Sequence, residues 1–176
     1  MPILNNFAGV IHRYHGASLI ALFDCVATLA EVLGERLRQI EIVDLLIPLL
    51  SRKWQELDDT DKRLLPLFEC FENVINAIGD VYIQPHVVQI YERCVRILKN
   101  ILETVRSDPK EGWVQTEAFF LRSSELISVI LLTMGVEKSS ELIHHQESLL
   151  LSLMVEFAGE RSLMARQTVF GLFGDI

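Results

Sequence analysis

The chain has 176 residues, of which 50% are hydrophobic and 23% charged, and its formal net charge is −8 from 24 acidic and 16 basic residues. This composition supplies one substantial hydrophobic core and excludes a disordered chain. Because phosphate binding requires a basic surface, we expect no nucleic acid partner, and the excess of acids favours basic protein partners instead.

The sequence contains no segment that we expect to target or cross a membrane. Residues 1–9 lack the basic start and the long apolar run of a signal peptide. The longest nearly unbroken apolar stretch, Leu126–Val136, is shorter than the roughly 20 residues that span a bilayer. We therefore expect a soluble protein without membrane insertion.

An apolar period of about 3.6 residues runs through the chain, and no segment alternates with a period of two. Glycines, Asp58-Asp59 and Asp108-Pro109 interrupt this pattern at intervals and mark the helix ends. The fold class is therefore all-α. The predicted helices cover residues 3–15, 18–33, 40–57, 62–78, 85–105, 117–134, 139–158 and 162–176.

Three of these helices share one pattern, an acid ten residues before a closing glycine. The pairs are Asp24 with Gly34, Glu69 with Gly79 and Glu125 with Gly135. A glycine can take the left-handed conformation that ends a helix. The acids are 45 residues apart in the first interval and 56 in the second. The excess of eleven equals the length of Arg106–Thr116, which we expect to be an enlarged, mobile loop that a protease cuts first.

A period near 45 residues with two helices in each repeat is typical of HEAT or armadillo arrays. The prediction is an all-α HEAT-repeat α-solenoid of stacked antiparallel hairpins, a single array over residues 1–176. Its repeats would cover approximately 1–34, 39–81, 85–135 and 139–176, the last one truncated. Because no polar capping repeat follows Ser162, we expect a fragment of a longer superhelix.

The shared acids are expected on the surface of their helices. Asp24 lies about 200° around the helix from Leu22, which belongs to the apolar stripe. In HEAT hairpins the second helices lie side by side along a concave wall. On that wall Asp24, Glu69, Glu125 and Asp175 would form an acidic ladder, with Glu31 and Glu72 beside it. The alternative is that they are ordinary solvated acids, as charged helix residues usually are.

No residue pattern for catalysis, a cofactor or a metal is present. The five histidines lack a third ligand at helical spacing, and neither a GxGxxG nor a GxxxxGK[ST] motif occurs. Cys25, Cys70 and Cys94 have no CxxC spacing and no paired histidine, so we expect small buried side chains in a reducing compartment. Trp54 is expected between two hairpins, and Trp113 in the enlarged loop. We expect no enzyme.

The segment Leu46–Cys70, with Lys53-Trp54 and Glu69-Cys70, resembles the transportins, the karyopherin-β2 class of the importin-β family. Leu19–Gly34, Met164–Ile176 and the stretch from Tyr91 to Val95 are also similar. The resemblance implies a nuclear import receptor with HEAT repeats, here a part of the C-terminal arch. Receptors of this class bind basic proline-tyrosine nuclear localisation signals along an acidic concave wall.

Carried over by motif, the residues that bind the signal would be Asp24, Glu31, Glu69, Glu125 and Asp175. The pockets for the Pro-Tyr end and the Ran site match nothing in this chain. The resemblance further implies Ran GTPase and nucleoporins as partners of a full-length receptor, which shuttles between cytoplasm and nucleus. The alternative function is a HEAT-repeat scaffold or adaptor that holds folded protein partners.

Overall fold

The computed structural model describes residues 14–145 and 149–176 and divides into two compact units, Met1–Ile83 (the N-terminal unit) and Gln84–Ile176 (the C-terminal unit). All regular elements in the described ranges are helices and none is a strand, which confirms the predicted all-α HEAT-type fold class. Of the helix predicted at residues 3–15, residues 3–13 lie outside the described residues, and Tyr14 and His15 are not helical. The elements are α2 (Ala17–Leu33), the 3-10 helix η2 (Gly34–Arg38), α3 (Ile40–Glu56), α4 (Leu64–Ile78), α5 (Asp80–Ser107), α6 (Pro109–His145), α7 (Leu149–Ala158) and α8 (Leu163–Asp175).

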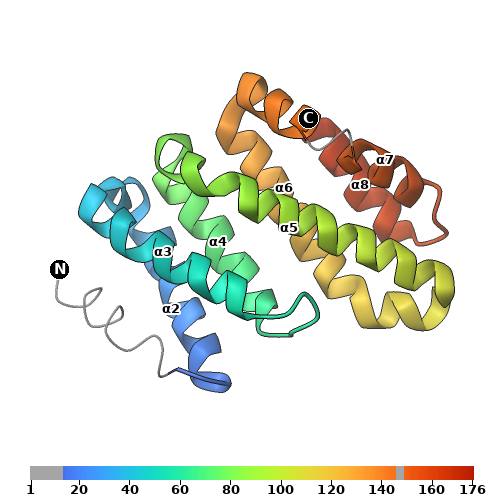
Figure 1. Cartoon of the computed structure of the whole chain (residues 1–176), viewed down its shortest axis with the longest axis horizontal. Helices are drawn as coiled ribbons and strands as arrows, with labels where there is room; N and C mark the ends of the chain where they lie inside the picture. Colours follow the sequence, from blue (N-terminus) through green and yellow to red (C-terminus); the bar gives the residue numbers. More distant parts are fainter. Residues whose placement is uncertain (1–13, 146–148) are drawn as a thin grey trace. The chain divides into compact units, whose positions relative to one another are not determined.

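In the N-terminal unit, α2 and α4 pack side by side, and α3 and α4 form an antiparallel hairpin (Figure 1). The apolar stripe predicted for α2 is buried, and Phe23 is fully so. Trp54 near the end of α3 packs edge-on against Phe68 and Phe71 of α4, with ring centroids 5.1 and 5.3 Å apart. Trp54 therefore fixes the α3–α4 hairpin from within, and such aromatic pairs add about 0.5–1.5 kcal/mol each beyond their buried area.

In the C-terminal unit, α8 packs against both α6 and α7. Phe120 of α6 and Phe157 of α7 lie 4.8 Å apart between ring centroids, and Trp113 packs edge-on against Phe120 at 5.4 Å. Ser162 begins α8, because its hydroxyl accepts a hydrogen bond from the Ala165 amide at 3.2 Å. The helices α2 and α4 in one unit, and α6 and α8 in the other, are the second helices of the predicted hairpins, and each pair is in contact.

The three predicted closing glycines all have positive φ. The φ angles are +49° at Gly34, +78° at Gly79 and +74° at Gly135. Their ψ angles of −130°, −176° and 168° differ from that of a left-handed helix, so the expected conformation was wrong in this angle. Backbone of this kind is almost restricted to glycine. At Gly135 this backbone breaks α6 into two helical segments. The break lies between the predicted helices 117–134 and 139–158.

The prediction that Arg106–Thr116 forms a loop is wrong, because α5 continues to Ser107 and α6 begins at Pro109. Asp108 caps α6, because its Oδ1 accepts hydrogen bonds from the Lys110 and Glu111 amides at 3.2 and 3.1 Å. Proline is favoured at the first helical position, so Asp-Pro here starts a helix. The additional residues of this repeat extend two helices, and α5 reaches 28 residues.

Gly112 has a packing role in this connection. A Cβ at this position would lie 2.9 Å from the Cα of Val105, so only glycine lets α6 approach α5 this closely. Trp113, expected in a loop, is a half-buried helix residue that packs on Phe120. The three signals that suggested a loop, namely Asp, Pro and Gly, thus act as a cap, a first helical residue and a close contact.

Two described segments, Ala17–Arg38 and Pro109–His144, are long and apolar enough to cross a membrane by length and composition alone. The first joins α2 to η2 across Gly34, and the second contains the break at Gly135. Within them, Phe23 and Leu126 are fully buried against neighbouring helices. Core helices of folded proteins have this composition as well, and these helices contribute to the cores of the two units.

Candidate functional site

The N-terminal unit places three of the five predicted site residues on the surfaces of its two contacting helices. Asp24 and Glu31 are exposed on α2, and Glu69 is exposed on α4. Asp24 and Glu31 lie seven residues apart, so they share one side of α2. The neighbouring positions Leu22, Phe23 and Val26 are buried, which turns that side outward.

Asp24 and Glu69 lie on two helices that pack against each other, α2 and α4, and both act on the Cys70 thiol. Burial raises the pKa of this thiol far above its usual value, and the charges of Asp24 and Glu69 raise it further. Two carboxylates on different helices therefore act on one buried sulfur atom. The acidic ladder predicted from the repeat positions of Asp24 and Glu69 stays a prediction.

The cysteines are only partly as predicted. Cys70 and Cys94 are buried, but Cys25 is exposed on α2, so the prediction of three buried thiols was wrong for Cys25. The buried stripe of α2 includes Leu22 and Val26 but not the position between them. Cys25 therefore lies outside the stripe, next to the acidic side.

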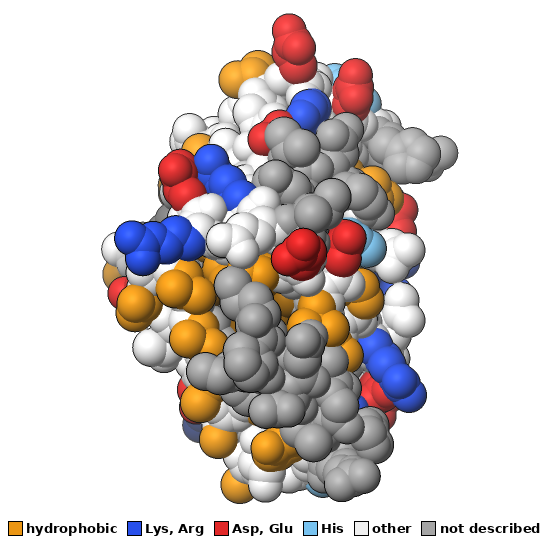
Figure 2. Space-filling model, turned by 90° about the vertical axis from the view of Figure 1, so that its left-hand side faces the viewer, with side chains coloured by type: hydrophobic (Ala, Val, Ile, Leu, Met, Phe, Trp, Pro, Cys, Tyr) orange, Lys and Arg blue, Asp and Glu red, His pale blue; other side chains and the backbone are white. Residues whose placement is uncertain are grey.

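Glu72, expected beside the ladder, is half-buried, and its Oε1 atom is fully buried. Glu69 and Asn76 of α4 are exposed, whereas Asn73 is half-buried like Glu72. We call Asp24, Glu31 and Glu69 the N-terminal acidic wall. On the face seen in Figure 2, hydrophobic side chains gather in the lower half of the view, and acidic and basic ones are interspersed above.

In the C-terminal unit the predicted acids have partners inside the protein. Glu125 on α6 is exposed, and its Oε2 lies 3.0 Å from Nη1 of Arg122. Asp175 at the end of α8 is half-buried, and its Oδ2 accepts a hydrogen bond from the Ser128 hydroxyl of α6. These two acids thus lie on neighbouring helices, as predicted, but both carboxylates are engaged by side chains of α6.

Sequence reasoning missed the roles of Arg122 and Ser128. The spacing of three between Arg122 and Glu125 is a helical ion-pair spacing and was a usable signal. Ser128 and Asp175 are 47 residues apart in the chain, and no local pattern links them.

Across the described residues no group of three or more His, Cys, Asp or Glu is arranged to hold a metal ion.

The amino-acid sequence of the chain is similar to those of known proteins. No family model matches the chain. Importin subunit beta-2 of Schizosaccharomyces pombe is 32% identical over 178 residues, which cover 99% of this chain and 19% of that protein. Importin subunit beta-2 of Saccharomyces cerevisiae is 30% identical over 181 residues, and Transportin-1 of Homo sapiens is 28% identical over 177. Both alignments cover 99% of this chain and 19% of the relative.

The chain is transportin-like along its whole length. This finding confirms the resemblance drawn from Lys53-Trp54 and Glu69-Cys70, and it agrees with the all-helical structure. The transportin-like chain spans 19% of the length of these relatives. The relatives carry the names of transport receptors and not of enzymes.

Proposed function

We propose that this chain is the part of a nuclear import receptor that binds basic proline-tyrosine localisation signals. The observation that supports the proposal is that Asp24 is exposed on α2 and Glu69 is exposed on α4, which packs against α2. Together with Glu31, these acids form a negative surface on two adjacent helices. The similarity to transportins and importin β-2 subunits supports the same role.

The mechanism is distributed electrostatic recognition. An extended basic peptide is disordered before it binds, so its ordering entropy opposes binding and many contacts must offset it. Arg and Lys side chains of the peptide would form charge-assisted hydrogen bonds to the carboxylates of the N-terminal acidic wall. Each exposed pair contributes about 0–1 kcal/mol, so selectivity depends on several acids acting together.

The wider roles belong to a full-length receptor. We propose that Ran GTPase and nucleoporins bind elsewhere in such a receptor, and that it moves between cytoplasm and nucleus. We propose no enzyme activity, cofactor or metal for this chain, and no binding of nucleic acid. The predicted division into four repeats remains a proposal as well.

The test is a titration of the isotopically labelled chain with a basic peptide that ends in Pro-Tyr, followed by nuclear magnetic resonance. This method measures dissociation constants into the millimolar range. Amide signals of α2 and α4 should shift, and a peptide with every Lys and Arg replaced by Gln should cause no shift. Equal binding of both peptides would favour the scaffold alternative, and absence of binding at millimolar concentration would refute the proposal for this chain.

A further inference from the structure

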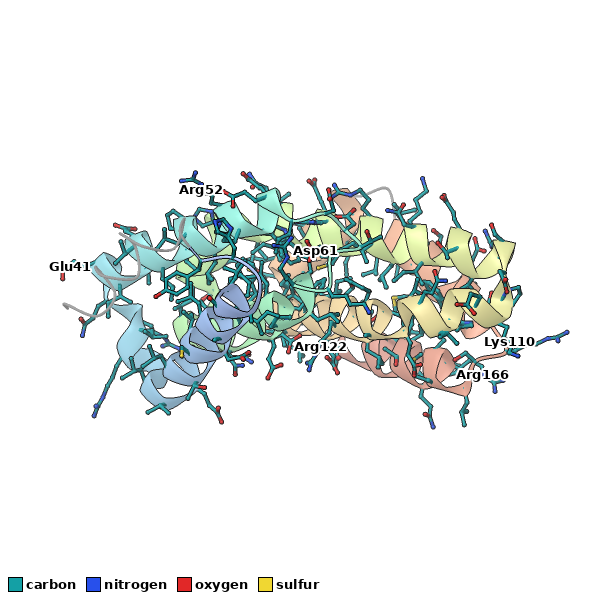
Figure 3. The ribbon with its side chains drawn as sticks, turned by 90° about the horizontal axis from the view of Figure 1, so that it is seen from below. Glu41, Arg52, Asp61, Lys110, Arg122 and Arg166 are labelled. Carbon is teal, nitrogen blue, oxygen red and sulfur yellow. The ribbon has the colours of Figure 1, made fainter. Side chains whose placement is uncertain are left out.

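The ion pair between Arg122 and Glu125 changes what the surface of α6 can bind. The two residues are one helical turn apart on α6, and Arg122 Nη1 lies 3.0 Å from Glu125 Oε2. Figure 3 labels Arg122 among the side chains of the ribbon. Their side chains are 35% and 49% exposed, so a ligand can reach the pair. A ligand that approaches Glu125 therefore meets a carboxylate that already has a cation beside it.

Two helical turns after Glu125, the same side of α6 contains no second acid. On α2, the acid Asp24 is followed seven residues later by Glu31, whereas on α6 the position seven residues after Glu125 is Leu132. Leu132 is 61% exposed. Over equivalent positions, α2 thus presents two negative charges, while α6 presents a neutral ion pair and an apolar side chain.

From these contacts we infer that Arg122 is a specificity-determining residue, which lowers the affinity of the α6 surface for Lys and Arg side chains of a bound peptide. This inference rests on the proposed function. A peptide cation can bind Glu125 only by displacing the Arg122 guanidinium or by sharing the carboxylate with it. Arg122 thereby leaves the α6 surface to uncharged residues of the peptide.

The size of the effect follows from the exposure of the pair. Exposed ion pairs contribute about 0.2–1 kcal/mol, and this is the free energy that a competing peptide cation has to replace. Since 1.4 kcal/mol corresponds to a factor of ten, removal of Arg122 should tighten binding of a basic peptide by about 1.4- to 5-fold. The gain should depend on the carboxylate of Glu125.

A control must separate this local effect from the change in net charge. Arg106 of α5 forms an ion pair with Glu156 of α7 and is 56% exposed. Arg106→Gln lowers the net charge by one unit and frees one carboxylate, as Arg122→Gln does, but that carboxylate belongs to Glu156 of α7 and not to Glu125. It is therefore the matched variant.

The experiment compares Arg122→Gln, Arg106→Gln, Glu125→Gln and the double variant Arg122→Gln/Glu125→Gln in the nuclear magnetic resonance titration with the basic Pro-Tyr peptide. Circular dichroism verifies the helicity of each variant. We expect Arg122→Gln to bind about 1.4- to 5-fold more tightly than the unchanged chain. In the Glu125→Gln background the same substitution should have no effect, because a double-mutant cycle isolates the pairwise contribution.

Three results would overturn the inference while the proposed function stands, and the first two concern the single variants. One is binding of the peptide with no gain from Arg122→Gln, and the other is an equal gain from Arg106→Gln. A gain that persists in the Glu125→Gln background has the same meaning, since it cannot arise from that carboxylate. If no variant binds the peptide at millimolar concentration, the proposed function fails, and the inference fails with it.

Discussion

Charge reversal of Asp24 and Glu69 is the most direct perturbation of the N-terminal acidic wall. A pair of unit charges 4 Å apart in water interacts by about 1 kcal/mol, the upper end of what exposed pairs contribute. Replacement of a carboxylate by an ammonium turns this attraction into repulsion, a change of about 1–2 kcal/mol, or roughly 5- to 30-fold in affinity. Asp24→Lys with Glu69→Lys should therefore weaken binding of a basic peptide more than either change alone.

The controls for this prediction come from acids on α3 and α5. Glu56 is unsuitable, because it lies 2.6 Å from Nζ of Lys53, whose side chain is only 8% exposed, and a lysine at 56 would face that buried ammonium. Asp44 and Glu103 are exposed on α3 and α5, and their double reversal changes the net charge by the same amount. We expect it to weaken binding far less.

The assay is calorimetric or nuclear magnetic resonance titration with the basic Pro-Tyr peptide at two salt concentrations. Near 0.15 M salt the screening length is about 8 Å, so higher salt should weaken binding to the unchanged chain and reduce the difference between variants. If reversal at 24 and 69 weakens binding no more than reversal at 44 and 103, the wall is an ordinary solvated surface. Insensitivity to salt would also contradict the electrostatic mechanism.

Three further predictions concern the fold. Gly79→Ala forces an L-residue into φ +78° and should cost about 1–3 kcal/mol, seen as a Tm lower by several degrees, whereas Gly171→Ala in open space inside α8 should not lower the Tm. A thiol reagent at pH 8 should label Cys25 rapidly and the other two cysteines only on unfolding, as mass spectrometry can show; rapid labelling of all three would contradict the described burial. Arg63 lowers the pKa of Asp61, so this carboxylate stabilises the fold above its unfolded-state pKa and loses that contribution as the pH falls through its lower folded value. Asp61→Asn should therefore reduce the loss of stability on acidification, measured by urea unfolding between pH 6 and 3.

Local signals in the sequence were sufficient for the helix ends that depend on backbone conformation. Gly34, Gly79 and Gly135 were predictable because a positive φ selects for glycine wherever the chain reverses. The connection at Asp108 was misread, because Asp and Pro mark both loops and helix starts, and only the cap hydrogen bonds decide between them. Exposure of Cys25 could have been predicted from its place outside the stripe of Leu22 and Val26.

For the candidate site, equivalence of position did not imply equivalence of chemistry. The repeat gave Asp24 and Asp175 corresponding places on second helices, but only contacts between helices determine what each carboxylate can bind. Asp175 accepts a hydrogen bond from Ser128 on the neighbouring helix, a partner 47 residues away that no local pattern reveals. Asp24 instead is exposed on α2, which packs against α4. Whether an acid repeated along a solenoid binds a peptide thus depends on the side chains that already engage its carboxylate, and the reversals at positions 24 and 69 test this for the proposed wall on α2 and α4.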